Sequence, residues 1–327
     1  MTTLSTPTVI GHDWAVDLLA RQIETGQVPH ALLITGPAHV GKSTLGRYFA
    51  QRLNCTGPQK PCGQCRSCLK VVSGNHPDVR IFDQPDEAIK IEQIRDLQRD
   101  LSLSAVESPY RVALLCGFER ATTSAANALL KTLEEPPPQV VLVLTAISPN
   151  LLLPTIVSRC QVLSLRPIPP AVVAEALQTR WQASAEQADL LAQLSAGRLG
   201  WAVQALADPS ILEQRTQALE SLLDLLHQSR ANRLAFAQTA SRNPRQVQEL
   251  LALWLSIWRD ILLLKSGSRT RPVNLDWQEQ LRPVAGAVSL VQAGEVVKTV
   301  RSALKNLDYN VNSRLNLEVV LLKLPRL

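Results

Sequence analysis

The stretch Gly36-Pro37-Ala38-His39-Val40-Gly41-Lys42-Ser43 fits the phosphate-loop pattern G-x-x-x-x-G-K-[ST]. The apolar run Ala31–Thr35 before it predicts a strand, and Thr44–Leu53 after it predicts a helix. This order matters because the glycines let backbone N–H groups surround phosphate oxygens, while the start of the helix adds positive potential. The stretch therefore predicts an α/β domain with a site for nucleotide phosphates.

Each part of this loop has an expected role. Lys42 would reach the β- and γ-phosphates of ATP or ADP, and Ser43 would ligate Mg²⁺. The residues predicted to bind nucleotide are Gly36, Gly41, Lys42, Ser43 and Thr44. The alternative to a phosphate loop is a glycine turn with a surface lysine. This alternative does not explain why the complete motif lies between a predicted strand and a predicted helix.

Short apolar runs alternate with helical patterns after the loop. The predicted strands are Val79–Phe82, Arg111–Leu115, Val140–Thr145 and Gln161–Leu165. The predicted helices between them are Ile91–Leu103 and Ser124–Glu135. Alternation at this spacing indicates a parallel sheet with helices on both faces.

The proline-rich segment Arg166–Pro170 breaks this alternation and predicts a hinge, because proline fixes φ and removes a backbone donor. Three helices are expected next, at Ala171–Arg180, Glu186–Ser195 and Gly200–Ala207. No strand pattern follows them. From about Asp208 onward the pattern favours helices only.

The clearest helical pattern lies in the C-terminal third. Apolar residues recur at offsets of three and four, along one face of a helix: Leu250, Leu253, Trp254, Ile257, Trp258, Ile261 and Leu262. The two tryptophans could form a platform for stacking bases, but this spacing favours core packing. Lys265 and Gly267 are the expected end of the helix.

The strand Arg111–Leu115 should end where a P-loop ATPase places acidic residues. An acid there would hold Mg²⁺, but the next residues are Cys116 and Gly117, which offer no side-chain oxygen. Glu119 comes two residues later and is expected to be a solvated turn residue. The sequence therefore predicts that bound nucleotide is not hydrolysed by this chain alone.

Composition narrows the class of protein further. Apolar residues make up 46% of the chain, yet no run approaches the roughly 18 residues that a membrane span needs. The polar start Met1–Pro7 lacks the features of a signal peptide, so we expect a cytoplasmic protein. The net charge of +6 permits contact with phosphates but argues against a zinc-containing DNA-binding module as the main role.

Four of the six cysteines lie close together in the sequence, at Cys55, Cys62, Cys65 and Cys68. Clustered cysteines in a reducing compartment are typically metal ligands, and C-x-x-C turns present two thiolates to one ion. Four thiolates close a structural Zn²⁺ site without an open position. An iron–sulfur cluster and a redox dithiol are the alternatives.

These motifs together resemble bacterial clamp-loader subunits of the AAA+ class, which serve DNA polymerase III. Besides the phosphate loop and the four cysteines, the resemblance rests on Val9–His12, Pro29–Leu33, Ile91–Arg95, Tyr110–Val112, Ala126–Pro137 and Ser158–Cys160. The Asn127–Pro137 stretch and the Ser-Arg-Cys triplet are a highly specific pair. The resemblance covers nearly the whole chain.

This family contains ATP-hydrolysing gamma/tau motor subunits and delta-prime subunits that complete a neighbour's ATP site. The chain departs from the motor pattern at Cys116-Gly117 and at Ala146-Ile147, where motors have a polar sensor. Gly200 stands where motors have a second sensor arginine, although Arg198 is close. The resemblance therefore favours the delta-prime kind, and a gamma/tau-type motor is the alternative.

The resemblance implies three parts: an AAA+ core over residues 1–166 with the cysteine insert at 55–68, a helical lid over 167–208, and a helical collar over 209–327. The tail Leu315–Leu324 would belong to the collar or would be an ordinary core helix. The implied partners are gamma/tau motors and a delta subunit in a five-subunit ring, with indirect contact to the sliding clamp and primer–template DNA.

By the same resemblance, Arg159 would act as an arginine finger in the ATP site of an adjacent motor subunit. The alternative is a surface arginine that caps the preceding helix. The chain would then be an accessory subunit of a DNA-directed DNA polymerase, without ATPase activity of its own.

Overall fold

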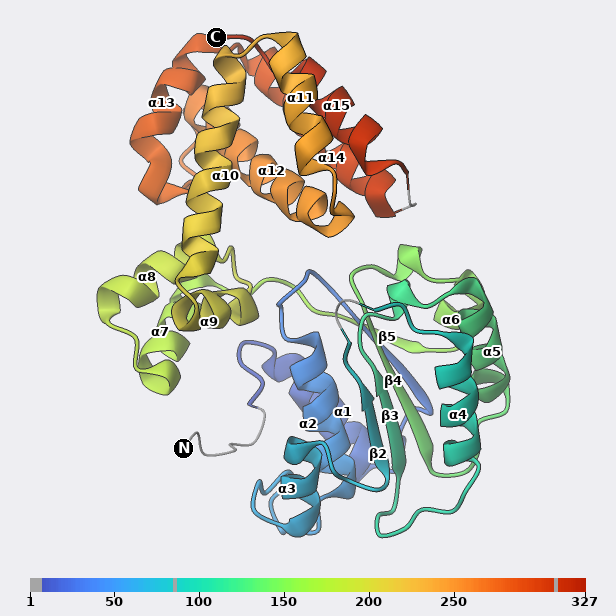
Figure 1. Ribbon diagram of the computed structural model, residues 1–327. Helices are drawn as coiled ribbons and strands as arrows, with labels where there is room; N and C mark the ends of the chain where they lie inside the picture. Colours follow the sequence, from blue (N-terminus) through green and yellow to red (C-terminus); the bar gives the residue numbers. More distant parts are fainter. Residues whose placement is uncertain (1–7, 85–86, 309–310) are drawn as a thin grey trace. The chain divides into compact units, whose positions relative to one another are not determined.

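The computed structural model describes residues 8–84, 87–308 and 311–327. Contacts divide the chain into two units, residues 1–176 with 197–201, and residues 177–196 with 202–327. The sheet lies in the first unit, and the second is helical (Figure 1). The polar start Met1–Pro7 lies outside the described residues.

Five parallel strands form the sheet of the first unit. They are β1 (Ala31–Thr35), β2 (Val79–Phe82), β3 (Arg111–Leu115), β4 (Val140–Ala146) and β5 (Gln161–Ser164). Their order is β2-β3-β4-β1-β5, so the phosphate loop leaves from an interior strand. The predicted parallel sheet is confirmed, and the predicted strand bounds are correct to within one residue.

Helices cover both faces of this sheet (Figure 1). They are α1 (Asp13–Glu24), α2 (Lys42–Asn54), α3 (Arg66–Ser73), α4 (Ile91–Leu101), α5 (Thr123–Glu134) and α6 (Pro154–Val157), with short 3₁₀ turns η1 (Phe118–Arg120) and η2 (Pro149–Leu151). Successive strand residues point to opposite faces, which is why Leu32 packs with α1 and α2 while Leu33 packs with α4 and α5.

Three helices among the described residues of the first unit were not predicted, and one is shorter than expected. Helix α1 precedes the sheet, α3 follows the cysteine cluster, and the short α6 precedes β5. Helix α4 ends at Leu101 rather than at Leu103, whose side chain is 63% exposed and therefore gives the helix no apolar contact to extend toward.

Helices alone follow β5 among the described residues. They are α7 (Pro170–Trp181), α8 (Ala185–Leu194), α9 (Leu199–Ala207), α10 (Ser210–His227), α11 (Arg230–Ala240), α12 (Pro244–Ser266), α13 (Gln278–Ala287), α14 (Leu290–Asp308) and α15 (Ser313–Lys323), with the turn η3 (Leu275–Trp277). This confirms the predicted helical second half. Within the described ranges no helix is long and apolar enough to cross a membrane.

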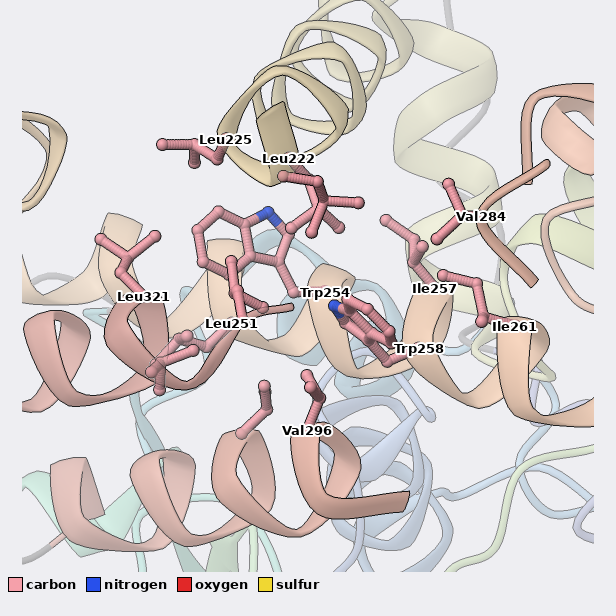
Figure 2. Packing of buried hydrophobic residues seen from close by; sticks show 14 of the residues in the cluster. Leu222, Leu225, Leu251, Trp254, Ile257, Trp258, Ile261, Val284, Val296 and Leu321 are labelled. Carbon is pink, nitrogen blue, oxygen red and sulfur yellow. The ribbon is translucent and has the colours of Figure 1, made fainter. Parts of the chain in front are cut away.

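Helix α12 runs through the core of the second unit. Trp254 and Trp258 are fully buried, among side chains from the neighbouring helices such as Leu222 of α10 and Val296 of α14 (Figure 2). The helix ends before Gly267, which has a φ of +66°. Core packing of the tryptophans is confirmed, and the stacking platform is excluded because neither ring reaches the surface.

A buried arginine joins the ends of two helices in this unit. Arg233 of α11 is 3% exposed, and its guanidinium donates five hydrogen bonds. The acceptors are the carbonyl oxygens of Leu225, Leu226, Leu321, Leu324 and Pro325. These carbonyls lie at the C-terminal ends of α10 and α15, where helix geometry provides no partner for them. All five N–H groups of the guanidinium are therefore satisfied.

Candidate functional site

The phosphate loop connects β1 to α2, as predicted. Gly41 precedes α2 with a φ of +107°, in the region that favours glycine. The ammonium of Lys42 donates to the carbonyl oxygens of Gly36 at 2.8 Å and Pro37 at 2.7 Å. Burial lowers the pKa of Lys42 to about 8, although the nearby Glu119 favours its charged form. The lysine is thus held inside the curve of the loop.

The two residues directly after β3 provide no carboxylate beside this loop. Cys116 occupies the first position after the strand, is buried and contacts the hydroxyl of Ser43. Burial raises the pKa of the Cys116 thiol, so it stays protonated at neutral pH. Gly117 donates its backbone N–H to the hydroxyl of Thr145 at 2.9 Å. Neither residue can offer Mg²⁺ an anionic oxygen.

Glu119 is not the solvated turn residue that the sequence suggested. The 3₁₀ turn η1 directs its side chain inward, where Oε2 is buried and has no hydrogen-bond partner among the described residues. Burial raises the pKa of Glu119, whereas the positive charges of Lys42 and Arg120 oppose that rise. A carboxylate therefore lies within electrostatic reach of Lys42, three positions after the expected one.

The start of α9 packs against the phosphate loop within the first unit. The backbone N–H of Gly200 donates to the carbonyl oxygen of His39 at 2.9 Å. A Cβ at position 200 would lie 2.9 Å from that same oxygen, closer than side-chain carbons approach backbone atoms. Nearby, the Arg198 guanidinium lies 5.8 Å from the ring centre of Trp201. Gly200 therefore permits a contact that a larger residue would prevent.

A cavity of about 370 Å³ opens beside the loop. Its lining includes Gly11, His12, Trp14 and the segment 166–169. A nitrogen of the His12 ring lies 3.0 Å from the carbonyl oxygen of Val40, which joins this lining to the loop. Its volume is in the range of small-ligand pockets.

The four clustered cysteines come together between α2 and α3. The sulfurs of Cys55, Cys62, Cys65 and Cys68 all lie within 4.8 Å of one another. The Cys55 and Cys65 sulfurs are 3.9 Å apart. Tetrahedral thiolate coordination of zinc gives sulfur–sulfur distances of about 3.8 Å. The four residues can therefore hold one metal ion.

The backbone around this cluster favours thiolates. Cys62 donates its N–H to the Cys55 sulfur at 3.3 Å, and Cys65 donates to the Cys62 sulfur at 3.2 Å. Burial opposes ionisation of Cys65, but N–H donors from Cys68 and neighbouring residues outweigh it and lower its pKa to about 5. A Cβ on Gly57 would lie 2.8 Å from the Cys62 sulfur, so the loop closes tightly around the cluster.

The cysteine cluster lies far from the phosphate loop. Helix α2 separates Lys42 from Cys55 and has 13 residues, so its ends are about 20 Å apart. The structure does not bring these two predicted sites together.

Arg159 follows α6 and precedes β5. Strands β1 and β5 are parallel, and Arg159 comes before β5 whereas the phosphate loop comes after β1. Arg159 therefore lies at the N-terminal ends of the strands, and the phosphate loop lies at their C-terminal ends. Its side chain is 35% exposed and forms an ion pair of 2.8 Å with Glu134. It also donates to the carbonyl oxygen of Thr155 at 2.9 Å. This arginine is therefore separate from the chain's own phosphate loop.

The known proteins that this chain resembles include several subunits of DNA polymerase III. Residues 11–169 match the family described as DNA polymerase III, delta subunit. The DNA polymerase III subunit delta' of Haemophilus influenzae is 30% identical over 308 residues, covering 93% of this chain and 91% of that protein. The subunit delta' of Bacillus subtilis is 36% identical over 179 residues, covering 54% of each chain.

The DNA polymerase III subunit tau of Escherichia coli is 35% identical over 154 residues, which cover 46% of this chain and 24% of that protein. The chain thus spans about half the length of the Bacillus relative and about a quarter of tau. The Haemophilus match extends over nearly all of both chains. On this match the chain belongs to the family of DNA polymerase III delta' subunits.

Proposed function

We propose that this chain is the delta-prime-type subunit of a DNA polymerase III clamp loader. It is a partner of gamma/tau motors and a delta subunit in a cytoplasmic five-subunit ring that acts on the sliding clamp and on primer–template DNA. One observation carries this proposal: Lys42 remains in its loop, while the two residues that follow β3 are Cys116 and Gly117 instead of acids. Such a site can bind phosphate without activating water.

The proposal assigns Arg159 to the ATP site of a neighbouring motor subunit. A guanidinium is charged at every physiological pH and can fork onto two phosphate oxygens. Its side chain is partly exposed and lies at the opposite end of the strands from Lys42, which supports action on another subunit rather than on this one. Fingers of this kind contribute about 10³–10⁵ to rate in other NTPases.

The phosphate loop is proposed to bind ATP or ADP without turnover. Backbone N–H groups after Gly36 and the ammonium of Lys42 would hold the phosphates, and the cavity beside His12 and Trp14 would receive the base. Glu119 lies near Lys42, but burial disfavours the charged form that an acidic ligand of Mg²⁺ needs, which raises the pKa of Glu119. The bound nucleotide would therefore be structural.

The four cysteines are proposed to hold Zn²⁺. When bound, the ion supplies a structural crosslink, since four thiolates leave no position for water. The distance of the cluster from Lys42, about one helix length, supports a structural role over a catalytic one.

Part of the second unit is proposed to form the ring's collar. Helix α15 exposes Leu315, Val319 and Leu322, which recur along one side of the helix at spacings of four and three. Its opposite side, with Leu317 and Leu321, is fully buried in this chain. One side of this helix packs in the core of the chain, and the other side is free to contact a neighbouring subunit. Leu315–Leu324 can therefore be a core helix of this chain and part of the collar at the same time.

The decisive experiment reconstitutes the complex from this chain and the source organism's gamma/tau and delta subunits. We expect Arg159→Ala to assemble normally and to lower DNA-dependent ATPase and clamp loading by about tenfold or more, because a transition-state charge is lost. Arg21→Ala, a change to an exposed arginine on α1, is the matched control.

Two results would contradict the proposal. Unchanged ATPase in assembled Arg159→Ala complexes would exclude the finger. Brisk ATP turnover by the isolated chain would instead favour the gamma/tau-type motor.

A further inference from the structure

We infer that Glu134 is a positioning residue for the Arg159 guanidinium. The inference rests on the proposed action of Arg159 on a neighbouring ATP site and adds a residue that directs it. Oε1 of Glu134 forms an ion pair with Nη2 of Arg159, the two atoms 2.8 Å apart. Nη1 of the same guanidinium donates to the Thr155 carbonyl oxygen at 2.9 Å. The planar group is thus held at two points, one from α5 and one from α6.

The position of Glu134 is unfavourable without this partner. It is the last residue of α5, where the helix dipole leaves partial negative charge on the final carbonyl groups. A carboxylate at this end is repelled, whereas the adjacent positive charge of Arg159 compensates. The next residue, Glu135, is exposed and has no ion pair among those formed by the described residues. Of the two neighbouring acids, only Glu134 therefore holds the arginine.

The two helices that carry these contacts are fixed relative to each other. Leu133 of α5 and Ile156 of α6 are 2% and 0% exposed and belong to one core cluster. A contact built on packed helices holds a side chain more accurately than one built on loops. Glu134 and Thr155 therefore form a firm support for the guanidinium.

This support leaves the arginine able to act. A guanidinium has five N–H groups. Nη1 of Arg159 donates to the Thr155 carbonyl oxygen and to the Ser158 hydroxyl at 3.4 Å, while Nη2 faces Glu134. Two N–H groups, one on Nε and one on Nη2, remain for the phosphate oxygens of a neighbour. Fixing the rotamer before the ring assembles reduces the conformational entropy lost when those bonds form. Glu134 thus orients the Arg159 guanidinium and leaves N–H groups available to bind phosphate.

The test uses the reconstituted complex and the variants Glu134→Gln and Glu135→Gln. The first keeps the shape of the side chain and removes the charge that holds Arg159. We expect it to lower kcat for DNA-dependent ATP hydrolysis on the order of tenfold, because a misplaced group loses catalytic advantage. ATP affinity and assembly should be unchanged, and Glu135→Gln should behave as the original chain.

A double variant separates orientation from any general effect on stability. In the Arg159→Ala background, Glu134→Gln should cause no further loss, since its target is gone. Full activity of Glu134→Gln while Arg159→Ala is impaired would overturn this inference and leave the proposed function intact. An equal additional loss in the Arg159→Ala background would overturn it as well. Unchanged activity of Arg159→Ala would instead refute the proposed function.

Discussion

Gly200 permits a close backbone contact between the start of α9 and the phosphate loop. Its backbone N–H bonds the carbonyl oxygen of His39, and a Cβ would come within 2.9 Å of that oxygen. The resemblance places a sensor arginine at this position in motors. Here an arginine could not be accommodated unless α9 or the phosphate loop moved. The close backbone contact with His39 therefore requires a residue without a side chain at position 200.

Gly200→Ala is expected to lower the free energy of unfolding of the first unit by about 1–3 kcal/mol, because the added methyl group overpacks the contact with His39. Gly294→Ala in α14 is the control, since nothing lies within 4 Å of a Cβ there. Urea unfolding of both variants checks this. If Gly200→Ala and the original chain had the same free energy of unfolding, the phosphate loop would be able to move away from the added methyl group without loss of stability, and the prediction would be wrong.

Glu119 shows where single-residue prediction fails. Its position two residues after Gly117 predicted a solvated turn residue, and this prediction was wrong. Its burial depends on the short turn η1, which is stabilised by tertiary packing of Phe118 in the core. Such a turn has no periodic pattern. The partner of Arg159 could not be predicted either, because Glu134 is 25 residues away in sequence and meets it only through packing.

At the scale of elements, a buried histidine connects α3 to the strands. His76 lies between α3 and β2, and its Nε2 is 3.0 Å from the Ser67 hydroxyl and 3.2 Å from the Ser108 hydroxyl. Its Nδ1 accepts the backbone N–H of Asp78 at 3.1 Å. This last bond requires an unprotonated Nδ1, so the cluster needs neutral His76.

We expect the first unit to lose stability as the pH falls below about 6.5, the ordinary value for histidine. Burial lowers the pKa of His76, despite the opposing negative charges of Glu107 and Asp78; Lys70 lowers it further. The unfolded chain therefore binds a proton first, and stability falls between 6.5 and the lowered pKa. His76→Asn should lose less stability over this interval, measured by hydrogen exchange of β2 and β3. If the stability of His76→Asn and of the original chain fell equally between these pH values, the prediction would be contradicted.

The cysteine segment is expected to contain one zinc ion per chain with four sulfur ligands by X-ray absorption. Chelation should increase hydrogen exchange over residues 55–73 because the crosslink between the cysteines is lost, while β4 stays protected. Cys62→Ser should reduce the zinc content, whereas Cys160→Ser should not, since Cys160 lies outside the cluster. Iron, or nitrogen and oxygen ligands, would refute the zinc assignment.

For the whole molecule, the patterns of apolar residues along the sequence were the best guide to the strands and helices. Buried parallel strands appear as largely continuous apolar runs, and this is why β1 and β3 were predicted with correct bounds. Strand β2 lies at the edge of the sheet, is only partly buried and includes the exposed Arg80. The stripe of α12 was equally clear because it extends over several turns. Helix α3 was missed because it has eight residues and follows a segment organised by cysteines, which have no helical period. Contacts between elements carry no such local pattern.

The buried guanidinium of Arg233 has a consequence for synthesis. Three of its five acceptors, at Leu321, Leu324 and Pro325, are made long after it, the last of them 92 residues later. Until those residues leave the ribosome, the cation lacks most of its partners and cannot be buried without a large desolvation penalty. The helical bundle therefore completes its folding only after residues 321–325 have been made, although the sheet can form while later residues are still being added.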